Sequence, residues 1–407
     1  MSEFFSVAPD DGADLATVQG LLSRVRSVPE LAERYDAIDT LHSLDDLIKV
    51  PLMVKNDLNV ALEHLKPKAD DATTWTFQSG GSTGSPKLGY APTGLYMAEV
   101  YERWKPLGPD DIFVNGWSAG KMWGGHYLFN ALADLSRCTG IGLGAIATSE
   151  YDAWLEFFRV RGVTALGGTP SVLRLIFAHA RDTGAELPGL RTVMWLGEAW
   201  DRALDEDIPA VAPQARRWGL YGSTETWVVG TNTPDCADNT WHTLPSQLVH
   251  IGEGEMLDFT SLKPRGLNPV LRYQTGDAGR WVSCTCGHPT QALQVLGRRD
   301  GVVKFRGFLL NVDDLVVELT GKPGVSRAQA VITNFEEKGS SLDVLVLASR
   351  EAGPGLAEGL RAHILGSAFG LSTVFNHDPE AFEVRIVDAL ISNDRTGKTS
   401  NLVQRQA

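Results

Sequence analysis

Apolar residues change their spacing several times between residues 110 and 230. The apolar run IGLGAIAT (141–148) precedes SEYDAWLEFFRVRG, whose apolar residues recur at helical spacing, and the short run VTALGG follows. Thr169 is then a favourable N-cap and Pro170 suits the first helical position of SVLRLIFAHARDTG, which leads into the apolar LRTVMWLGE. This order of strand, helix, strand, helix and strand predicts a parallel sheet with helices on its faces.

Glycine-rich or polar segments follow the predicted strands of this region. They are GGTP, LGEAW and YGSTET. Ligands of parallel sheets bind beyond the carboxyl ends of the strands. We therefore expect these three segments to line a binding site.

The pattern changes twice in the rest of the chain. Residues 245–297 contain shorter β-rich pieces with frequent turns, which predict a separate antiparallel subregion. After GRRDG, a compact unit is predicted with two strands in VVKFRGFLLN, a helix starting near Val312, strands in AQAVITNF, LDVLVLAS and AFEVRIVD, and a helix in GLAEGLRAHILGSAF.

The predicted fold class is therefore α/β, with two domains. A large N-terminal domain (1–299) would hold mostly parallel sheets flanked by helices and would include the β-rich subregion at 245–297. A small, mobile α+β domain (300–407) would follow, and Asp300 stands at the boundary.

Composition supports a folded, enzyme-sized protein and disfavours two classes of partner. The chain has 407 residues, of which 43% are hydrophobic and 21% charged, with a net charge of −13. Nucleic acids and anionic membranes attract basic surfaces, so neither is an expected partner. The N-terminus lacks the basic segment followed by an apolar segment that marks a secretion signal. No run of 18 apolar residues occurs either, so we expect a cytoplasmic location. A homodimer is left open.

The stretch TFQSGGSTGSPKLGYAP (76–92) is the first candidate for binding chemistry. Glycines allow the backbone amides to approach a ligand, and a concave run of such donors suits phosphate oxygens. A Walker loop needs glycine before its lysine and Ser or Thr after it, whereas Pro86 and Leu88 flank Lys87. An ordinary P-loop NTPase is disfavoured, and a plain Gly/Ser surface loop stays open at this point.

Four further stretches carry residues suited to nucleotide chemistry. They are LYGSTET with Tyr221, Thr224 and Glu225; YQTGD with Asp277; VLGRRDGVVKFRG with Arg298 and Asp300; and NDRTGKTS with Lys398. A carboxylate at a strand end can hold Mg²⁺ together with substrate phosphates. Taken singly, each also fits an ordinary role as a helix-terminal charge, a turn residue, a surface cation or a tail lysine.

Together and in this order, the motifs resemble the acyl-adenylating superfamily of acyl-CoA synthetases, peptide-synthetase adenylation domains and luciferases, over residues 75 to 400. The resemblance implies that the glycine-rich loop binds the β- and γ-phosphates of ATP through Ser79, Gly80, Gly81, Ser82, Thr83, Gly84 and Lys87. It implies adenine and ribose contacts from Gly197, Glu198, Tyr221, Gly222, Asp277 and Arg298. It also implies that Thr224 and Glu225 hold the α-phosphate and Mg²⁺, that Asp300 is a hinge, and that Lys398 bridges the carboxylate and the α-phosphate.

Within this superfamily the chain is most similar to the phenylacetate-CoA ligase branch. LHSLDDLIKVPLMVKNDL (41–58), the GE of LGEAW, and CTCG before GRRD carry that similarity, which stand-alone adenylating proteins of phenazine-type antibiotic pathways share. Two departures from the family's motifs concern the second half-reaction, in which the thioester forms. NVDDLVVEL replaces the usual Pro and Glu after the second glycine motif, and SNDRTGKTSNL matches the lysine motif loosely.

The cysteines suggest a structural metal site. Cys236 and His242 in DCADNTWH, with Cys284 and Cys286 in SCTCGH, could supply the Cys₃His set of a closed zinc site. His250 or His288 could substitute for His242. The alternative is that these are small buried thiols without a metal.

Aromatic residues suggest the nature of the substrate. Nine of the 11 tryptophans lie between Trp104 and Trp241. The segment NGWSAGKMWGGHY (115–127) combines Trp117, Trp123 and His126 without a clear period, as expected of a segment lining an acyl pocket, although most of these aromatics would be core.

The sequence thus predicts an enzyme that uses ATP and Mg²⁺ to activate a carboxylic acid, aromatic in our interpretation, as its acyl-adenylate. Transfer to coenzyme A would follow. One alternative is a stand-alone activator that passes the adenylate to a carrier protein or a reductase in secondary metabolism. Another is a non-catalytic protein that binds a nucleotide or an aryl acid.

Overall fold

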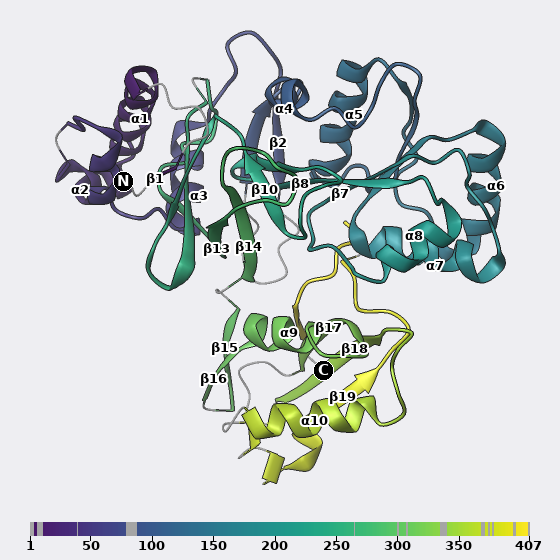
Figure 1. Ribbon diagram of the computed structural model, residues 1–407. Coiled ribbons are helices and arrows are strands. Elements are labelled where there is room, and N and C mark those ends of the chain that lie inside the picture. Colours follow the sequence, from purple (N-terminus) through teal and green to yellow (C-terminus); the bar gives the residue numbers. More distant parts are fainter. Residues whose placement is uncertain are drawn as a thin grey trace.

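The computed structural model describes most of the chain in two connected parts (Figure 1). The described residues are 4–5, 11–38, 40–78, 88–263, 265–298, 301–306, 308–333, 340–367, 371–372, 375–376, 378–393 and 396–405.

A 12-stranded sheet runs through the larger part. Its parallel half consists of β5 (Thr139–Ile141), β4 (Ile112–Asn115), β6 (Ala165–Gly168), β7 (Thr192–Leu196) and β8 (Arg216–Ser223). Its antiparallel half continues with β9 (Trp227–Asn232), β10 (Thr240–Thr243), β14 (Ala292–Arg298), β13 (Tyr273–Val282), β12 (Met256–Ser261), β11 (Gln247–Ile251) and β1 (Phe4–Phe5).

Helices cover both faces of the parallel half. Successive residues of a strand point to opposite faces, and the strands here carry apolar residues on both. On β7, Val193 and Trp195 pack in one core cluster with α6 (Tyr151–Arg161), α7 (Pro170–Thr183) and α8 (Leu204–Val211). Met194 packs in a different cluster with α4 (Met97–Arg103) and α5 (Gly125–Ser136). The sheet is therefore buried on both sides, as the sequence pattern predicts.

A third core cluster joins the N-terminal helices to the antiparallel half of the sheet. These helices are α1 (Asp11–Arg26), α2 (Pro29–Asp36) and α3 (Lys55–Leu65), with a 3-10 turn η1 (Leu44–Lys49) between α2 and α3. The hairpin of β2 (Thr74–Gln78) and β3 (Leu88–Pro92) leads from them into the parallel half, and short 3-10 turns η2 (Thr148–Glu150) and η3 (Glu253–Glu255) lie farther along.

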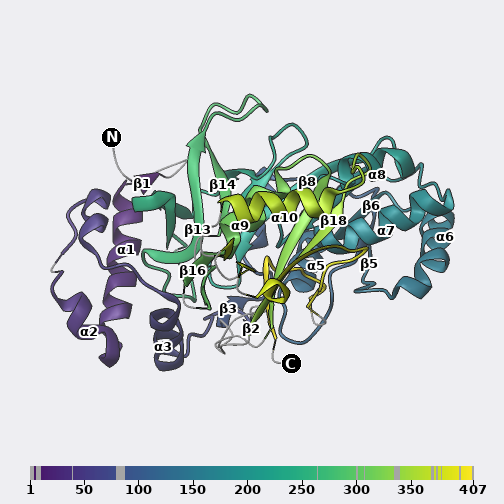
Figure 2. The same ribbon diagram turned by 90° about the horizontal axis from the view of Figure 1, so that it is seen from below.

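The smaller part has its own sheet and its own core. It begins with β15 (Val302–Phe305), β16 (Phe308–Asn311) and α9 (Val312–Thr320). A four-stranded sheet of β19 (Phe382–Ile386), β18 (Ser341–Ala348), β17 (Val325–Thr333) and β20 (Leu402–Arg405) follows, with α10 (Leu356–Ser367) and the 3-10 turn η4 (Pro379–Ala381). Seen from below, α9 and α10 lie between α1–α3 at one end and α6–α8 at the other (Figure 2).

Several expectations from the sequence are confirmed. Helix α7 begins at Pro170, and the Thr169 side chain accepts a hydrogen bond from the Val172 amide at 3.4 Å, so Thr169 is the N-cap. The two strands after GRRDG, the helix at Val312 and the later strands and helix all form.

Two expectations are wrong. The predicted strand 141–148 ends at Ile141, because the chain turns there: the Leu143 amide donates to the Ile141 carbonyl and the Gly144 amide donates to Asn115. The β-rich subregion at 245–297 is not separate from the parallel sheet. Strand β10 pairs with β9 on one side and β14 on the other, which makes the two halves continuous.

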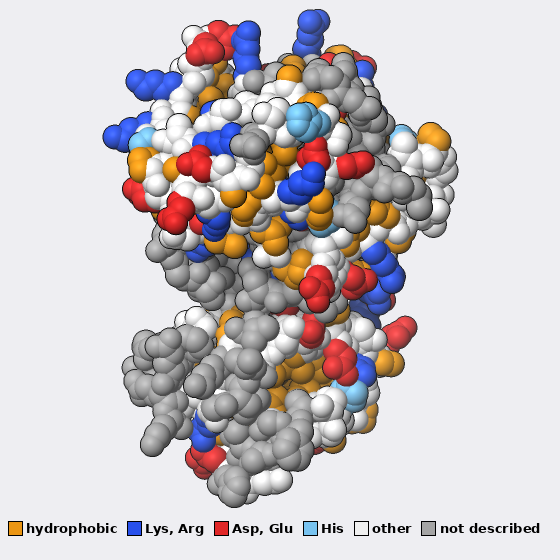
Figure 3. Space-filling view, turned by 90° about the vertical axis from the view of Figure 1, so that its left-hand side faces the viewer, with side chains coloured by type: hydrophobic (Ala, Val, Ile, Leu, Met, Phe, Trp, Pro, Cys, Tyr) orange, Lys and Arg blue, Asp and Glu red, His pale blue; other side chains and the backbone are white. Residues whose placement is uncertain are grey.

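The surface on the α1–α3 side carries charges of both signs. Figure 3 shows that Lys and Arg side chains are interspersed there with Asp and Glu and with hydrophobic atoms. Among the described helices, the longest near this face, α1, has 16 residues, and no described helix has the length and apolarity needed to cross a bilayer.

Gly167 on β6 provides a test of this packing. A Cβ at Gly167 would lie 2.1 Å from the Trp117 ring, which is 1% exposed and stacked on Phe129. We expect Gly167→Ala to lower the free energy of unfolding by about 1–3 kcal/mol through overpacking, measured by denaturant titration. Gly140→Ala on β5 is the matched control, since its nearest neighbour would be 3.8 Å away. Equal effects of the two substitutions would contradict this account.

Candidate functional site

The carboxyl ends of the parallel strands meet along one edge of the sheet. Strands β4, β6, β7 and β8 run side by side in parallel register, so the segments after Gly168, Leu196 and Ser223 lie along that edge. These are the segments GGTP, LGEAW and YGSTET, which the sequence pattern predicts to line a site.

Lys398, from the tail of the smaller part, lies at this edge. A Cβ at Gly197 would stand 2.5 Å from Lys398 Nζ and would displace the lysine side chain from its position, and Gly197 also has φ +94°, which favours glycine. The ammonium lies 5.2 Å from the centroid of the Trp123 ring, within the range of a cation–π interaction. The tail lysine and the end of β7 are therefore in direct contact.

Glu198 connects three separate segments next to this lysine. One carboxylate oxygen accepts hydrogen bonds from the Ser171 amide at 3.0 Å and the Ser171 hydroxyl at 2.6 Å, and lies 3.4 Å from Arg327 Nη1. The other oxygen accepts a hydrogen bond from the amide of Thr399. The Glu198 side chain is 3% exposed, so these contacts balance a buried charge.

Tyr221, Asp277 and Arg298 come together beside β8. The Tyr221 hydroxyl donates to Asp277 Oδ2 at 2.5 Å, and Arg298 lies opposite Asp277 in the β13–β14 register, with Nη1 3.7 Å from Oδ1. Burial and then the Asp277 carboxylate raise the pKa of Tyr221 well above its usual value, so its hydroxyl stays protonated. The Tyr221 ring stacks on Trp241 at 5.7 Å between centroids.

Glu225 is held in a buried position close to the start of β9. It is 2% exposed and accepts a hydrogen bond from the Tyr273 hydroxyl at 2.6 Å. Burial and then the Glu225 carboxylate raise the pKa of Tyr273 far above its usual value, which keeps that hydroxyl a donor.

Two glycines set the backbone around Thr224. A Cβ at Gly89 on β3 would lie 2.0 Å from the Thr224 carbonyl oxygen, and a Cβ at Gly222 would lie 1.9 Å from the Trp227 carbonyl oxygen. Strand β3, the first described element after residue 78, therefore passes beside Thr224. The phosphate-binding residues predicted at Ser79 to Gly84 and at Lys87, and the predicted hinge Asp300, lie outside the described residues.

The three predicted acyl-pocket residues occupy different environments. Trp117 is 1% exposed and stacks on Phe129 at 3.5 Å between ring centroids. His126 is 8% exposed, and its Nδ1 donates to the Trp117 carbonyl oxygen at 2.8 Å. Trp123 is the one of the three that faces Lys398 in a described contact.

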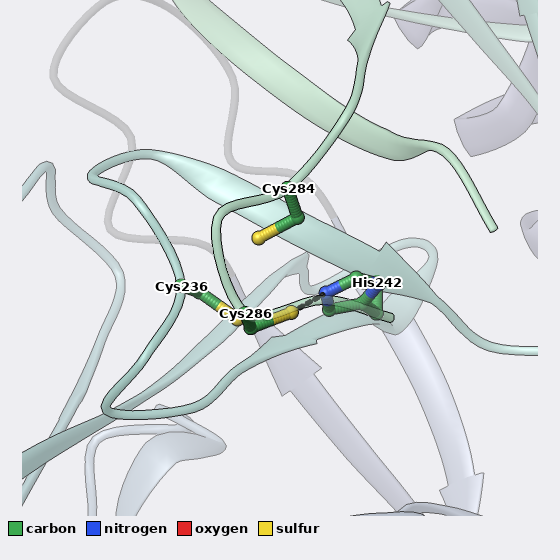
Figure 4. A group of neighbouring side chains, drawn as sticks. All are labelled: Cys236, His242, Cys284 and Cys286. Carbon is green, nitrogen blue, oxygen red and sulfur yellow. Dashed lines mark hydrogen bonds between the residues drawn. The ribbon is translucent and has the colours of Figure 1, made fainter. Parts of the chain in front are cut away.

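The predicted metal ligands lie together in the antiparallel half of the sheet. Figure 4 shows Cys236, His242, Cys284 and Cys286 with their side chains pointing toward one another. Their candidate ligand atoms are all within 4.8 Å of one another. The alternatives to His242 are otherwise engaged: His250 Nδ1 is 2.6 Å from an oxygen of Asp258, and His288 is exposed with Nδ1 3.0 Å from the Thr290 hydroxyl.

Several residues of the site escaped sequence analysis. Ser171, Arg327 and Thr399 bind Glu198, Tyr273 holds Glu225, and Trp241 packs on Tyr221. Thr399 could have been suspected, because it follows Lys398 directly. The other four carry no local signal, since their roles depend on partners far away in the chain.

Comparison with known proteins gives a consistent result. A family model described as AMP-binding enzyme matches residues 15–252. The chain is 26% identical over 293 residues to an L-proline–[L-prolyl-carrier protein] ligase of Streptomyces coelicolor, covering 62% of this chain and 52% of that protein. It is 30% identical over 217 residues to phosphinothricin tripeptide synthetase PhsC of Streptomyces viridochromogenes, covering 44% and 18%. The chain thus spans about half, or less, of the length of these relatives.

The fold has solved counterparts. A crystal structure of 2-hydroxyisobutyryl-CoA ligase in the postadenylation state superimposes with a TM-score of 0.69 at 17% identity, covering 98% of this chain and 91% of that one. At this identity the likeness concerns the fold, an α/β architecture with helices flanking a large sheet.

The Glu198 contacts predict how firmly the tail is held. In Glu198→Gln the charge opposite Arg327 is lost, and charged hydrogen bonds contribute about 1.5–3 kcal/mol each. We expect amide hydrogen exchange in residues 396–400 to become about ten- to a hundredfold faster, measured by mass spectrometry. Glu206→Gln is the control, because Glu206 is exposed and 3.9 Å from Arg350. Unchanged exchange at Thr399 would contradict the role given to Glu198.

Proposed function

Because the chain belongs to the AMP-binding enzyme family, we propose that it uses ATP to activate a carboxylic acid as its acyl-adenylate. One oxygen of the acid attacks the α-phosphorus of ATP. The bond between the α-phosphorus and the oxygen bridging to the β-phosphate breaks, and pyrophosphate leaves with that electron pair. The observation that carries this proposal is the position of Lys398 against Gly197, at the carboxyl edge of the parallel sheet.

Lys398 would act on the charge of the reacting groups. Negative charge is shared between the attacking carboxylate and the α-phosphate oxygens in the transition state, and a fixed cation beside both stabilises it. The contacts of Thr399 with Glu198 hold the neighbouring backbone, so the ammonium would need little reorganisation during the reaction. Lys398 is therefore proposed as a catalytic residue and Glu198 as a positioning residue.

Glu225 is proposed as the protein ligand of Mg²⁺, and Thr224 as a contact of the α-phosphate. A single fixed carboxylate fits Mg²⁺, which binds one or two carboxylates together with substrate phosphates and water. When bound, Mg²⁺ would neutralise charge on the ATP phosphates. The hydrogen bond from Tyr273 keeps the Glu225 carboxylate in one position for this purpose.

The nucleoside of ATP is proposed to bind along the ends of β7 and β8. Asp277 would accept the ribose hydroxyls with Arg298 beside it, and Tyr221 and Gly222 would flank the adenine, supported by the grouping of Tyr221 with Asp277 at 2.5 Å. Since the Glu198 carboxylate binds the tail, a nucleotide contact here would come from the backbone of Gly197 and Glu198.

An aromatic acid is the substrate class we propose. Trp123 lies under the Lys398 ammonium, and the adjoining residue Gly124 has the rings of Trp227 and Phe77 at 3.4 and 3.5 Å from a Cβ placed on it. Phe77 and Trp227 meet edge to face at 5.3 Å between centroids. Aromatic surfaces next to the reacting end favour a flat apolar acid.

Coenzyme A is the proposed acceptor, and the smaller part would turn about Asp300 to admit it. A carrier protein is the runner-up, supported by the similarity to a protein named as a carrier-protein ligase. Transfer to a reductase, a place in antibiotic biosynthesis and membership of the phenylacetate-CoA ligase branch stay proposals that rest on the sequence motifs. A binding protein without turnover is disfavoured by the contacts that hold Lys398 and Glu225 in place.

Replacing Lys398 tests the chemical step. We expect Lys398→Ala to slow ATP–pyrophosphate exchange by at least about a hundredfold, the effect of removing one donor that stabilises transition-state charge, while ATP affinity changes little. Lys322→Ala is the control, because Lys322 is in the same part of the chain and pairs with Glu318 at 3.6 Å. Exchange at the wild-type rate in Lys398→Ala would refute the role of the tail lysine.

A panel of acids identifies the substrate and the acceptor. Pyrophosphate exchange with aryl and aliphatic acids should be fastest with an aryl acid, because of the aromatic side chains around Trp123. Thioester formation is then measured with coenzyme A and with a phosphopantetheinylated carrier protein. Preference for an aliphatic acid would contradict the proposed pocket, and absence of exchange with every acid would favour the binding protein.

A further inference from the structure

Cys236, His242, Cys284 and Cys286 come from two separate turns of the antiparallel half of the sheet. Cys236 lies in the connection between β9 and β10, and His242 is on β10 itself. Cys284 and Cys286 lie in the connection between β13 and β14. The two connections are in contact, because the Thr285 hydroxyl donates to the Asp235 carbonyl across them at 2.9 Å, and β10, which carries His242, pairs with β14.

The four side chains converge on one point (Figure 4). Three sulfur atoms and one ring nitrogen lie within 4.8 Å of one another, and His242 Nε2 is 3.1 Å from Cys286 Sγ. In a tetrahedral zinc site with bonds of about 2.3 Å to sulfur, two sulfurs are about 3.8 Å apart. The observed spacing therefore needs only small shifts of the side chains to hold an ion.

The surroundings fit a metal better than they fit free thiols. All three cysteines are unbridged in the described structure although their sulfurs are neighbours. Cys236 is 4% exposed, and its sulfur accepts a hydrogen bond from the Thr233 amide at 3.3 Å and lies 3.2 Å from the Thr233 hydroxyl, the kind of contact that supports a thiolate ligand. His242 presents Nε2 to the Cys286 sulfur, and its ring also packs against the His288 ring at 4.5 Å between centroids.

We propose that Cys236, His242, Cys284 and Cys286 bind one structural Zn²⁺ ion. Thiolate and imidazole are the ligands that select zinc, and four protein ligands fill its tetrahedral shell without leaving a position for substrate. The ion therefore does not take part in the reaction. It fastens the β9–β10 connection to the β13–β14 connection, at the opposite end of β14 from Arg298.

This site is independent of the proposed function, since it lies outside the edge that carries Lys398 and would exist in a protein of the same fold with any substrate. Metal binding would contribute free energy of folding to the antiparallel half of the sheet. Metal content and stability therefore test the proposal, and activity does not.

Metal analysis of the full chain tests the proposal. Protein purified without chelator and freed of any affinity tag should contain one equivalent of zinc, and Cys284→Ser and His242→Ala should each reduce it to below about a tenth. Cys138→Ser is the matched control, because the Cys138 thiol lies near the Ala133 carbonyl at 3.8 Å and outside the group. His288→Ala should also retain zinc.

A second set of measurements uses the wild-type protein, so that the proposal is tested even if the variants fail to fold. Organomercurial titration of the folded wild-type protein should release one equivalent of zinc to a chromogenic chelator, and chelation should lower the melting temperature. Replacement by Co²⁺ should give thiolate-to-metal charge-transfer bands and the intense visible bands of a tetrahedral site. Folded wild-type protein with no zinc, with iron in its place, or with an octahedral cobalt spectrum would overturn the proposal.

Discussion

The buried Glu198 carboxylate is the contact on which the geometry of the site depends. At 3% exposure this charge is stable only if hydrogen-bond donors and a cation surround it. Those donors come from the start of α7, from β17 and from the tail, so the carboxylate has its full set of partners when the tail lies along the sheet edge. Lys398 precedes the Thr399 amide that contacts Glu198, and its position against Gly197 follows from the same contact.

The continuity of the 12-stranded sheet is a second constraint, because it relates residues from both halves of the larger part. Tyr221 lies on the last parallel strand, whereas Asp277 and Arg298 lie on antiparallel strands that reach it through β10. The pairing of β9, β10, β14 and β13 therefore places Asp277 within hydrogen-bond distance of Tyr221. The proposed zinc ion would stabilise this pairing, because it would join the β9–β10 connection to the β13–β14 connection, at the end of β14 away from Arg298.

Much of the fold could be predicted because its signals are local. Helix α7 is marked by an N-cap threonine and a proline within two residues, and the strands of the parallel half are short apolar runs between helices. The errors occur where the deciding contacts are not local. Strand β20 was not predicted, since its four residues become a strand only by pairing with β17, and the segment after Ile141 leaves the sheet through hydrogen bonds to other strands.

The sequence by itself determined which chemical groups are present and in what order: the carboxylates Glu225 and Asp277, the tail lysine Lys398, and the Cys₃His set, each embedded in a recognisable local motif. Only the tertiary structure decided which groups meet. Glu198 and Thr399 are separated by 201 residues, and their hydrogen bond, like the choice of His242 over His250 as the partner of the cysteines, depends on how separate elements pack. Local patterns report the conformation of a few consecutive residues, whereas the balance of a buried charge or the filling of a metal shell depends on groups that only packing brings within reach.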